Sequence, residues 1–209
     1  MTSPRYVNCF ARDYIDKAFA GAGIPLNNVQ GVFYGQCMQR MLEGLLVQGV
    51  DVVVACDGDS LFVDRDIMQL VQRLESNPEV DAIASMQIRR GNKTMLASLA
   101  GESKLEIEGH PVKVSTAHFG LTAIDLRKLA AVEKPWFFSR PCDDGTWGDA
   151  RIDDDIWFWQ QWGKAGNSLY LDPQTRIGHL EEMVVMVHPQ TYEAVHAYPS
   201  EWVESCSSN

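Results

Sequence analysis

The stretch Val50-Asp51-Val52-Val53-Val54-Ala55-Cys56-Asp57-Gly58-Asp59-Ser60 decides the expected fold. Its first seven residues are mostly β-branched or apolar, as in a strand that is covered on both faces of a sheet. This pattern stops abruptly at the Asp-Gly-Asp that follows. In α/β proteins, ligands bind beyond the carboxyl ends of such strands. We therefore predict that the two aspartates face a ligand.

The aspartate pair predicts a cation site. In extended backbone, residues two apart point to the same side, so Asp57 and Asp59 would bring two like charges together. Carboxylate oxygens are ligands for Mg²⁺ or Mn²⁺, and such an ion can bridge a diphosphate. Gly58 lets a ligand approach the backbone closely. Asp and Gly are also common in turns, so this stretch alone leaves a simple turn open.

Helical and strand patterns alternate on both sides of this stretch. Apolar spacing and Gly or Pro stops predict helices over residues 13–22, 34–48, 64–75, 122–131 and 154–165. Strands are expected over residues 50–56, 81–89 and 168–171. This alternation predicts an α/β fold with a mostly parallel central sheet flanked by helices.

Composition limits the class of protein. A chain of 209 residues suits one domain, 1–209. The net charge of −10 argues against non-specific binding to nucleic acid. The apolar runs are shorter than the ~20 residues that span a bilayer, and no signal-peptide pattern opens the chain. The 5 cysteines are odd in number and form no C-x-x-C pair, which indicates reduced thiols in a cytoplasmic, soluble protein.

A second acidic group, Asp153-Asp154-Asp155, precedes the expected helix over 154–165. Aspartates stabilise the start of a helix, but three in a row exceed what capping needs. A carboxylate here could instead take a proton from an acceptor hydroxyl, and the residues leave the cap and the base equally open. Trp157 or Trp159 would then be either a stacking wall for a sugar or part of the core.

Two histidines stand in a context that suggests a site. His179 follows the strand expected over 168–171, and beside a carboxylate pair it becomes a candidate third metal ligand. Imidazole suits Mn²⁺ better than Mg²⁺. His118 is a candidate for lining the site, because Gly120 allows close approach of the backbone to a ligand.

Taken together, these segments resemble the GT-A-fold glycosyltransferases, particularly the compact group common in bacteria and phages. Five segments follow the family's order: residues 34–59 with Arg40 and the DxD motif, residues 115–129, Lys134-Pro135-Trp136-Phe137, residues 153–158, and Ile177-Gly178-His179-Leu180. Haloacid-dehalogenase-type phosphatases also end a buried strand in Asp-x-Asp. That class predicts neither the middle segment nor the closing Gly-His.

The resemblance implies a Rossmann-like GT-A fold and a role for each matching residue. Asp59 and His179 would bind the metal, with Asp57 touching the metal or the ribose. Asp155 would be the catalytic base of an inverting enzyme, with Asp154 beside it; in a retaining enzyme the same acidic residues would position the acceptor. Residues 1–115 would form the nucleotide-sugar half, and residues 116–209 the half that binds the acceptor and completes the metal site. The donor would be bound by Ser3, Pro4, Arg5 and Tyr6 near its base, by Arg40 near its phosphates, and by Asp57, Gly58, His118 and Gly120.

The expected activity is that of a metal-dependent, hexosyltransferase-like glycosyltransferase. It would move a sugar from a UDP-sugar or GDP-sugar, with Mn²⁺ or Mg²⁺, to an acceptor hydroxyl on a glycan, a metabolite or a modified DNA base. One alternative is a haloacid-dehalogenase-like phosphatase with Asp57 as nucleophile. The others are a nucleotidyltransferase, whose usual basic glycine-rich N-terminal loop the chain lacks, and a non-catalytic sugar-nucleotide-binding module.

Overall fold

The chain folds around one mixed sheet. The computed structural model describes residues 2–3, 8–88, 97–98, 109–187 and 191–198. The five-stranded sheet has the strand order β3-β9-β5-β10-β7. Its strands are β3 (Val52–Ala55), β5 (Ala82–Met86), β7 (Val112–Lys113), β9 (Thr122–Asp125) and β10 (Tyr170–Arg176).

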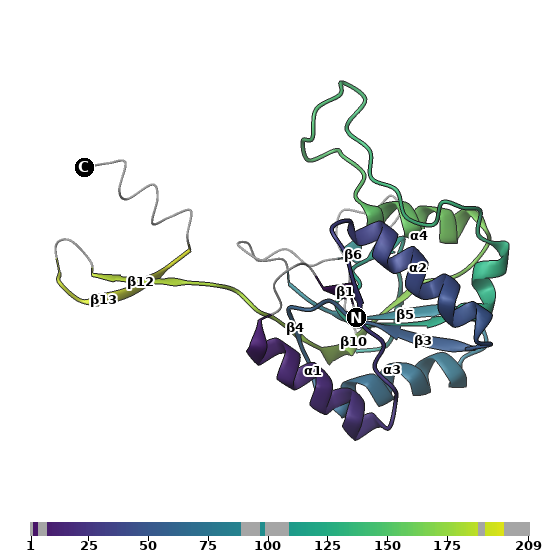
Figure 1. Cartoon of the computed structure of the whole chain (residues 1–209), viewed down its shortest axis with the longest axis horizontal. Helices are drawn as coiled ribbons and strands as arrows, with labels where there is room; N and C mark the ends of the chain where they lie inside the picture. Colours follow the sequence, from purple (N-terminus) through teal and green to yellow (C-terminus); the bar gives the residue numbers. More distant parts are fainter. Residues whose placement is uncertain (1, 4–7, 89–96, 99–108, 188–190, 199–209) are drawn as a thin grey trace.

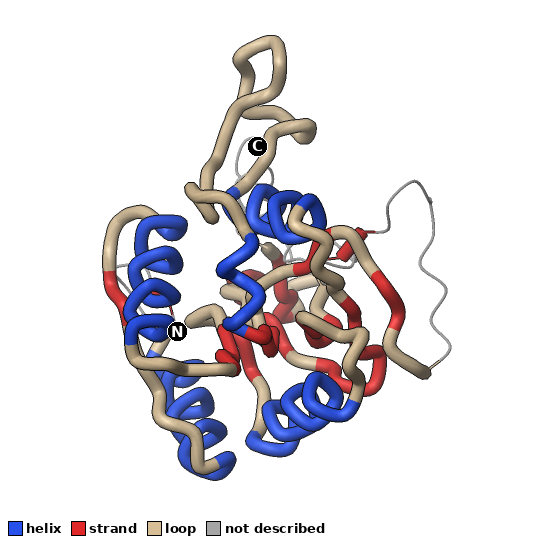
Figure 2. Tube along the Cα trace, turned by 90° about the vertical axis from the view of Figure 1, so that its right-hand side faces the viewer, coloured by secondary structure: helices blue, strands red, loops and turns tan. Residues whose placement is uncertain are grey.

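Four helices cover the two faces of this sheet, so the body has three layers (Figures 1 and 2). α1 (Cys9–Ala22) and α3 (Asp64–Ser76) lie on one face, and α2 (Tyr34–Val47) and α4 (Asp154–Lys164) lie on the other. The helices predicted over 34–48, 64–75 and 154–165 are confirmed to within a residue or two at their ends.

The first helix begins earlier than predicted. Asn8 caps α1, because its Oδ1 accepts hydrogen bonds from the backbone N–H of Phe10 at 2.9 Å and of Ala11 at 3.4 Å. Gly23 ends the helix in the left-handed conformation, with φ of +69°. The cap at Asn8 therefore adds a turn that the apolar spacing alone did not predict.

The prediction of a mostly parallel sheet is wrong. Of the four strand pairs, β5–β10 is parallel, and β3–β9, β5–β9 and β7–β10 are antiparallel. The cause is β9, which lies between β3 and β5 and runs against both. β3, β5 and β10 nevertheless run in the same direction, so their carboxyl ends meet at one edge of the sheet.

The segment over 122–131 is not the predicted helix. Thr122–Asp125 forms β9, and Leu126–Ala131 forms the 3₁₀ helix η1. Every residue of β9 is buried, as its central place in the sheet requires. Asp125 ends the strand and caps η1 by accepting a hydrogen bond from the Arg127 N–H at 3.1 Å. A short apolar run does not by itself distinguish a buried strand from a helix.

Alternate side chains of the sheet point into two separate hydrophobic cores, one on each face. Val53 and Ala55 point toward α2 and α4, whereas Val52 and Val54 point toward α1 and α3. Beneath α4 the core is aromatic: the Phe119 ring stacks on Trp159 at 5.1 Å between centroids. These buried rings fix the start of α4, which carries the acidic group.

Short strand pairs complete the described part of the chain. They are β1 (Thr2–Ser3) with β2 (Val29–Gln30), β4 (Ser60–Leu61) with β11 (Gly178–His179), β6 (Ala97–Ser98) with β8 (Thr116–Ala117), and β12 (Val184–Val187) with β13 (Ala194–Ala197). The β12–β13 hairpin, here called the C-terminal arm, stands out from the body (Figure 1). A loop that is closed by two hydrogen bonds between Arg140 and Ile152 rises on another side, beyond α4.

Candidate functional site

The Asp-Gly-Asp segment forms a tight turn at the carboxyl end of β3. The Ser60 N–H donates to the Asp57 carbonyl oxygen at 3.3 Å, and β4 starts at Ser60. The two aspartates therefore lie on a turn rather than on the extended backbone that the sequence suggested. The turn and the site are compatible, because the turn holds both carboxylates at the edge where β3, β5 and β10 end.

A short strand pair brings His179 to this turn. β4 and β11 are antiparallel, with Gly178 opposite Leu61 and His179 opposite Ser60. The Leu180 N–H donates to the Asp59 carbonyl oxygen at 2.8 Å. At Gly178, a Cβ atom would lie 3.2 Å from Leu61 Cβ, which is a tight approach for a larger residue. The backbone itself thus sets His179 beside Asp59.

Gln87, just after β5, holds the two strands of this pair together. Its side chain is buried, and its Nε2 donates to Ser60 Oγ at 3.1 Å and to the Gly178 carbonyl oxygen at 3.2 Å. Gln87 was not predicted as a site residue. Its only signal in the sequence is its position near the end of the strand expected over 81–89.

The contact between His179 and Asp59 joins an imidazole to a carboxylate. His179 Nδ1 lies 3.0 Å from the Ile88 carbonyl oxygen, which only accepts, so Nδ1 carries the proton. His179 Nε2 faces Asp59 Oδ2 at 3.4 Å. A protonated ring would donate from this nitrogen to Asp59, whereas a neutral ring presents a lone pair that is able to bind a cation. A backbone carbonyl on the other ring nitrogen is the usual support of a metal-binding histidine.

Asp57 lies in the same electrostatic environment. Burial raises its pKa to about 7, with further contributions from the carboxylates of Asp59 and Asp155, and His179 opposes part of this rise. The carboxylates of Asp59, in the turn after β3, and of Asp155, in α4, therefore both repel the charged form of Asp57. A divalent cation would relieve this repulsion, so the residues present fit such an ion.

No larger metal-binding group is preassembled: across the described ranges, no three side chains of His, Cys, Asp or Glu are close enough to hold an ion together. Mg²⁺ is commonly held by one or two carboxylates together with water and substrate phosphates. The side chains of His179 and Asp59 keep 15% and 33% of their surface exposed, which leaves room for such additional ligands.

Asp154 and Asp155, which were predicted together as catalytic residues, have different surroundings at the start of α4. Burial raises the pKa of Asp155, and the N–H of Ile156, 2.8 Å from its Oδ1, opposes this rise. A raised pKa suits a general base that works near neutral pH. The charge of Asp155 also contributes to the raised pKa of Asp57.

Asp154 has a structural contact instead. Its Oδ2 accepts a hydrogen bond from the Gly35 N–H at 3.1 Å, in the first turn of α2. Phe33, the N-cap residue of α2, has no side chain that could do this. A Cβ at Gly35 would lie 2.9 Å from the Asp154 carboxylate, so the glycine permits the contact. Asp154 thus caps a helix that is distant in sequence.

Gly120 packs between the side chains of Gln87 and His118. His118 is buried; its Nε2 lies 2.9 Å from the Ser85 carbonyl oxygen, and its Nδ1 accepts from the Gly120 N–H at 2.8 Å. A Cβ at Gly120 would lie 2.5 Å from Gln87 Oε1 and 2.6 Å from His118 Nδ1. Close packing within the chain thus accounts for this glycine. The lining roles predicted for both residues remain predictions.

The buried imidazole of His118 predicts a pH-dependent stability. Burial lowers its pKa from 6.5 to about 4, although its hydrogen bond to Ser85 opposes this shift. The ring is neutral when folded, so the unfolded state binds more protons below pH 6.5. The contribution of His118 to the free energy of unfolding is complete above pH 6.5 and is lost as the pH falls toward 4. At pH 5 the loss is about 2 kcal/mol.

We expect the pH dependence of the free energy of unfolding between pH 7 and pH 5 to be shallower in His118→Gln than in the wild type. Urea unfolding at each pH measures it. Equal slopes in the two proteins would contradict the assignment, whatever the variant's absolute stability.

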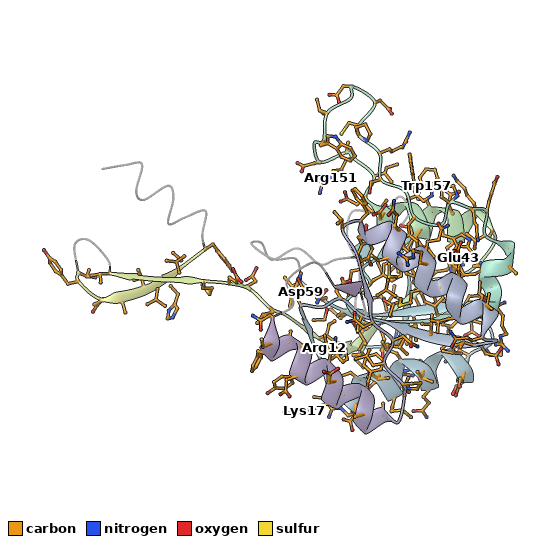
Figure 3. The ribbon with its side chains drawn as sticks, viewed as in Figure 1. Arg12, Lys17, Glu43, Asp59, Arg151 and Trp157 are labelled. Carbon is orange, nitrogen blue, oxygen red and sulfur yellow. The ribbon has the colours of Figure 1, made fainter. Side chains whose placement is uncertain are left out.

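The remaining predicted donor residues are less fully described. Arg40 is exposed on α2. Ser3 belongs to β1, where only its backbone is described, and Pro4, Arg5 and Tyr6 lie outside the described residues. Gly58 lies in the turn between the two aspartates. Of the two candidate sugar walls, Trp159 is buried in the core, and Trp157 lies at the surface of α4 against Phe138 (Figure 3).

None of the helices in the described ranges is both long enough and apolar enough to cross a bilayer.

Comparison with known proteins gives a fold likeness. Neither the protein-family models nor the curated proteins include a match to this sequence. Among solved structures, A197 from STIV has a TM-score of 0.63 at 13% identity, over 93% of this chain and 91% of that one. At this identity the likeness concerns the fold alone.

Two further similar structures are glycosyltransferases. GalNAc-T7 with UDP, GalNAc and Mn²⁺ has a TM-score of 0.48 at 12% identity, over 85% of this chain and 37% of that one. The mannosyltransferase PcManGT from Pyrobaculum calidifontis, in complex with GDP-Man and Mn²⁺, has a TM-score of 0.47 at 14% identity, over 91% of this chain and 57% of that one. The chain therefore spans less than two thirds of either protein.

Proposed function

We propose that this protein is a metal-dependent glycosyltransferase of the GT-A type, which moves a sugar from a UDP-sugar or GDP-sugar to an acceptor hydroxyl. The observation that carries this proposal is the contact between Asp59 Oδ2 and His179 Nε2 at 3.4 Å, with His179 Nδ1 held by the Ile88 carbonyl. This contact between Asp59 and His179, which are distant in sequence, supports the proposal.

The residues of the site would have separate roles in binding the metal and the donor. Asp59 and His179 would hold Mn²⁺ or Mg²⁺, and Asp57 would contact the ion or the ribose. When bound, the ion would stabilise the negative charge that develops on the departing diphosphate. Arg40 and the segment 3–6 would bind the donor phosphates and base, with Gly58, His118 and Gly120 lining the donor site.

Asp155 would act on the acceptor. In an inverting reaction its carboxylate takes the proton from the acceptor hydroxyl, whose oxygen bonds to the anomeric carbon while the bond from that carbon to the diphosphate oxygen breaks. The raised pKa of Asp155 supports this role. The loop between Arg140 and Ile152 would close over the sugar and exclude the water that otherwise hydrolyses the donor.

Thermal melting with UDP, GDP, ADP and CDP, each with and without Mn²⁺, tests the donor site. We expect one nucleotide to raise the melting temperature only when Mn²⁺ is present. At a hundredfold excess over Kd the gain is about 2.7 kcal/mol, which corresponds to roughly 5–10 °C in a domain of this size. A labelled sugar nucleotide then reports whether the sugar reaches an acceptor.

Two results would contradict the proposal. One is the absence of any Mn²⁺-dependent shift with all four nucleotides. The other is release of phosphate from simple phosphoesters with label trapped on Asp57, which would establish the phosphatase alternative. Donor binding without any transfer to a broad set of acceptors would instead favour the non-catalytic sugar-nucleotide-binding module.

A further inference from the structure

The proposed metal ligands Asp59 and His179 belong to a very short strand pair. β4 and β11 have two residues each and form a two-stranded sheet, with Asp59 directly before β4 and His179 at the end of β11. A pair of strands is marginally stable without further support. The distance between the Asp59 carboxylate and the His179 ring therefore depends on what holds the two strands together.

One buried amide supplies this support. The Gln87 side chain is 3% exposed, and its Nε2 donates to Ser60 Oγ on β4 at 3.1 Å and to the Gly178 carbonyl oxygen on β11 at 3.2 Å. An amide nitrogen has two hydrogens, so both bonds can form at once. Ser60 follows Asp59 in the chain. Gly178 precedes His179, so each bond ends one residue from a proposed ligand.

The surroundings of Gln87 restrict the position of this amide. A Cβ at Gly120 would lie 2.5 Å from Gln87 Oε1, so the glycine permits the amide oxygen to pack against the backbone. The carbonyl oxygen of the next residue, Ile88, lies 3.0 Å from His179 Nδ1. The segment that follows β5 thus contacts both short strands through a side chain and the histidine ring through its backbone.

We propose that Gln87 is a positioning residue that sets the affinity of the site for Mn²⁺ or Mg²⁺, and this inference rests on the proposed metal site. Two atoms that each lie about 2.1 Å from one ion are at most about 4.2 Å apart. Asp59 Oδ2 and His179 Nε2, at 3.4 Å, are within that limit. Gln87 keeps them there by binding both strands. Loss of a hydrogen-bonding partner behind a metal ligand commonly weakens metal binding by about 10- to 100-fold.

A titration with Mn²⁺, followed by electron paramagnetic resonance, tests this role, because the signal of the free aqueous ion is lost when the ion binds. Gln87→Met keeps a neutral side chain of similar size and removes both hydrogen bonds. We expect its Kd for Mn²⁺ to rise by about 10- to 100-fold. The titration is made with Mn²⁺ alone and again with UDP or GDP, so it does not depend on sugar transfer.

Gln69→Met is the matched control. Gln69 is a partly buried residue of α3, and its Nε2 donates to the buried Asp172 Oδ2 at 2.9 Å. The same substitution therefore removes a hydrogen bond to a buried carboxylate and lowers the stability of the protein. We expect this variant to keep the wild-type Kd for Mn²⁺, which separates positioning of the ligands from a general loss of stability.

Ser60→Ala removes one of the two hydrogen bonds of Gln87 and is a second, milder test. We expect it to raise the Kd for Mn²⁺ by less than Gln87→Met does. In the Gln87→Met background it should have little further effect, because the bond between the two side chains is already absent there. If Gln87→Met does not fold, Ser60→Ala decides the question against the Gln69→Met control.

A Kd for Mn²⁺ in folded Gln87→Met that equals the wild-type value, or that rises no more than in Gln69→Met, would overturn this inference alone. So would an unchanged Kd in Ser60→Ala where Gln87→Met does not fold. A wild-type protein that binds Mn²⁺ neither alone nor with nucleotide would overturn the metal site itself, and the glycosyltransferase proposal together with this inference.

Discussion

Replacing Asp59 with Asn is expected to abolish the Mn²⁺-dependent binding of the nucleotide and to lower sugar transfer on the order of a thousandfold. The substitution keeps the size of the side chain but removes the charge that faces His179 Nε2 at 3.4 Å. A bound metal supplies several kcal/mol of transition-state stabilisation, and each 1.36 kcal/mol corresponds to about tenfold in rate. Nucleotide-dependent melting and transfer from a labelled donor measure the two effects.

Asp51→Asn is the matched control for this result. Asp51 precedes the same strand, β3, at the end opposite to Asp59, and is exposed. The change removes the same charge, so net charge alone cannot explain a difference between the two variants. If Asp59→Asn keeps the wild-type rate of sugar transfer, Asp59 is not part of the metal site and the proposed mechanism is wrong.

Replacing Asp155 with Asn is expected to lower kcat by about a hundredfold to ten-thousandfold while leaving Mn²⁺-dependent nucleotide binding in place. The amide cannot take up the proton of the acceptor hydroxyl, although it fills the same space at the start of α4. Single-turnover transfer, set beside nucleotide-dependent melting, separates the chemical step from donor binding.

A substitution of the neighbouring Asp154 is the comparison for the substitution of Asp155. Because its carboxylate caps α2 through the Gly35 N–H, Asp154→Ala should cost about 1 kcal/mol of stability and reduce kcat far less than the change at 155. Equal losses of kcat in the two variants, or a larger loss at 154, would reverse the assignment of cap and base.

The helices and β3 could be predicted from the sequence because their signals are local. Apolar spacing and stop residues suffice for α2 and α3, and a run of valines suffices for β3. The place of β9 could not be predicted. It depends on pairing with β3 and β5, and the four residues Thr122–Asp125 are too few for periodicity to separate strand from helix.

The site shows the same division between local and long-range information. Asp57 and Asp59 are marked by their positions after a strand and Asp155 by its position at the start of a helix, and the charges of Asp59 and Asp155 both raise the pKa of Asp57. The Ile88 carbonyl, which fixes the tautomer of His179, belongs to the backbone. The type of residue at position 88 therefore does not predict this hydrogen bond. The different contact of Asp154 depends on Gly35, which is distant in sequence.

The central position of β9 has a consequence for the origin and the dissection of this chain. Residues 1–115 contain β3 and β5, yet the strand that joins these two comes from residues 116–209. A fragment cut at that boundary would leave both strands with an open edge, prone to aggregate rather than to fold. The two halves are therefore not folding units, and two separately expressed fragments should regain structure only when they are refolded together. By the same reasoning, such a chain does not readily arise by fusion of two pre-existing modules.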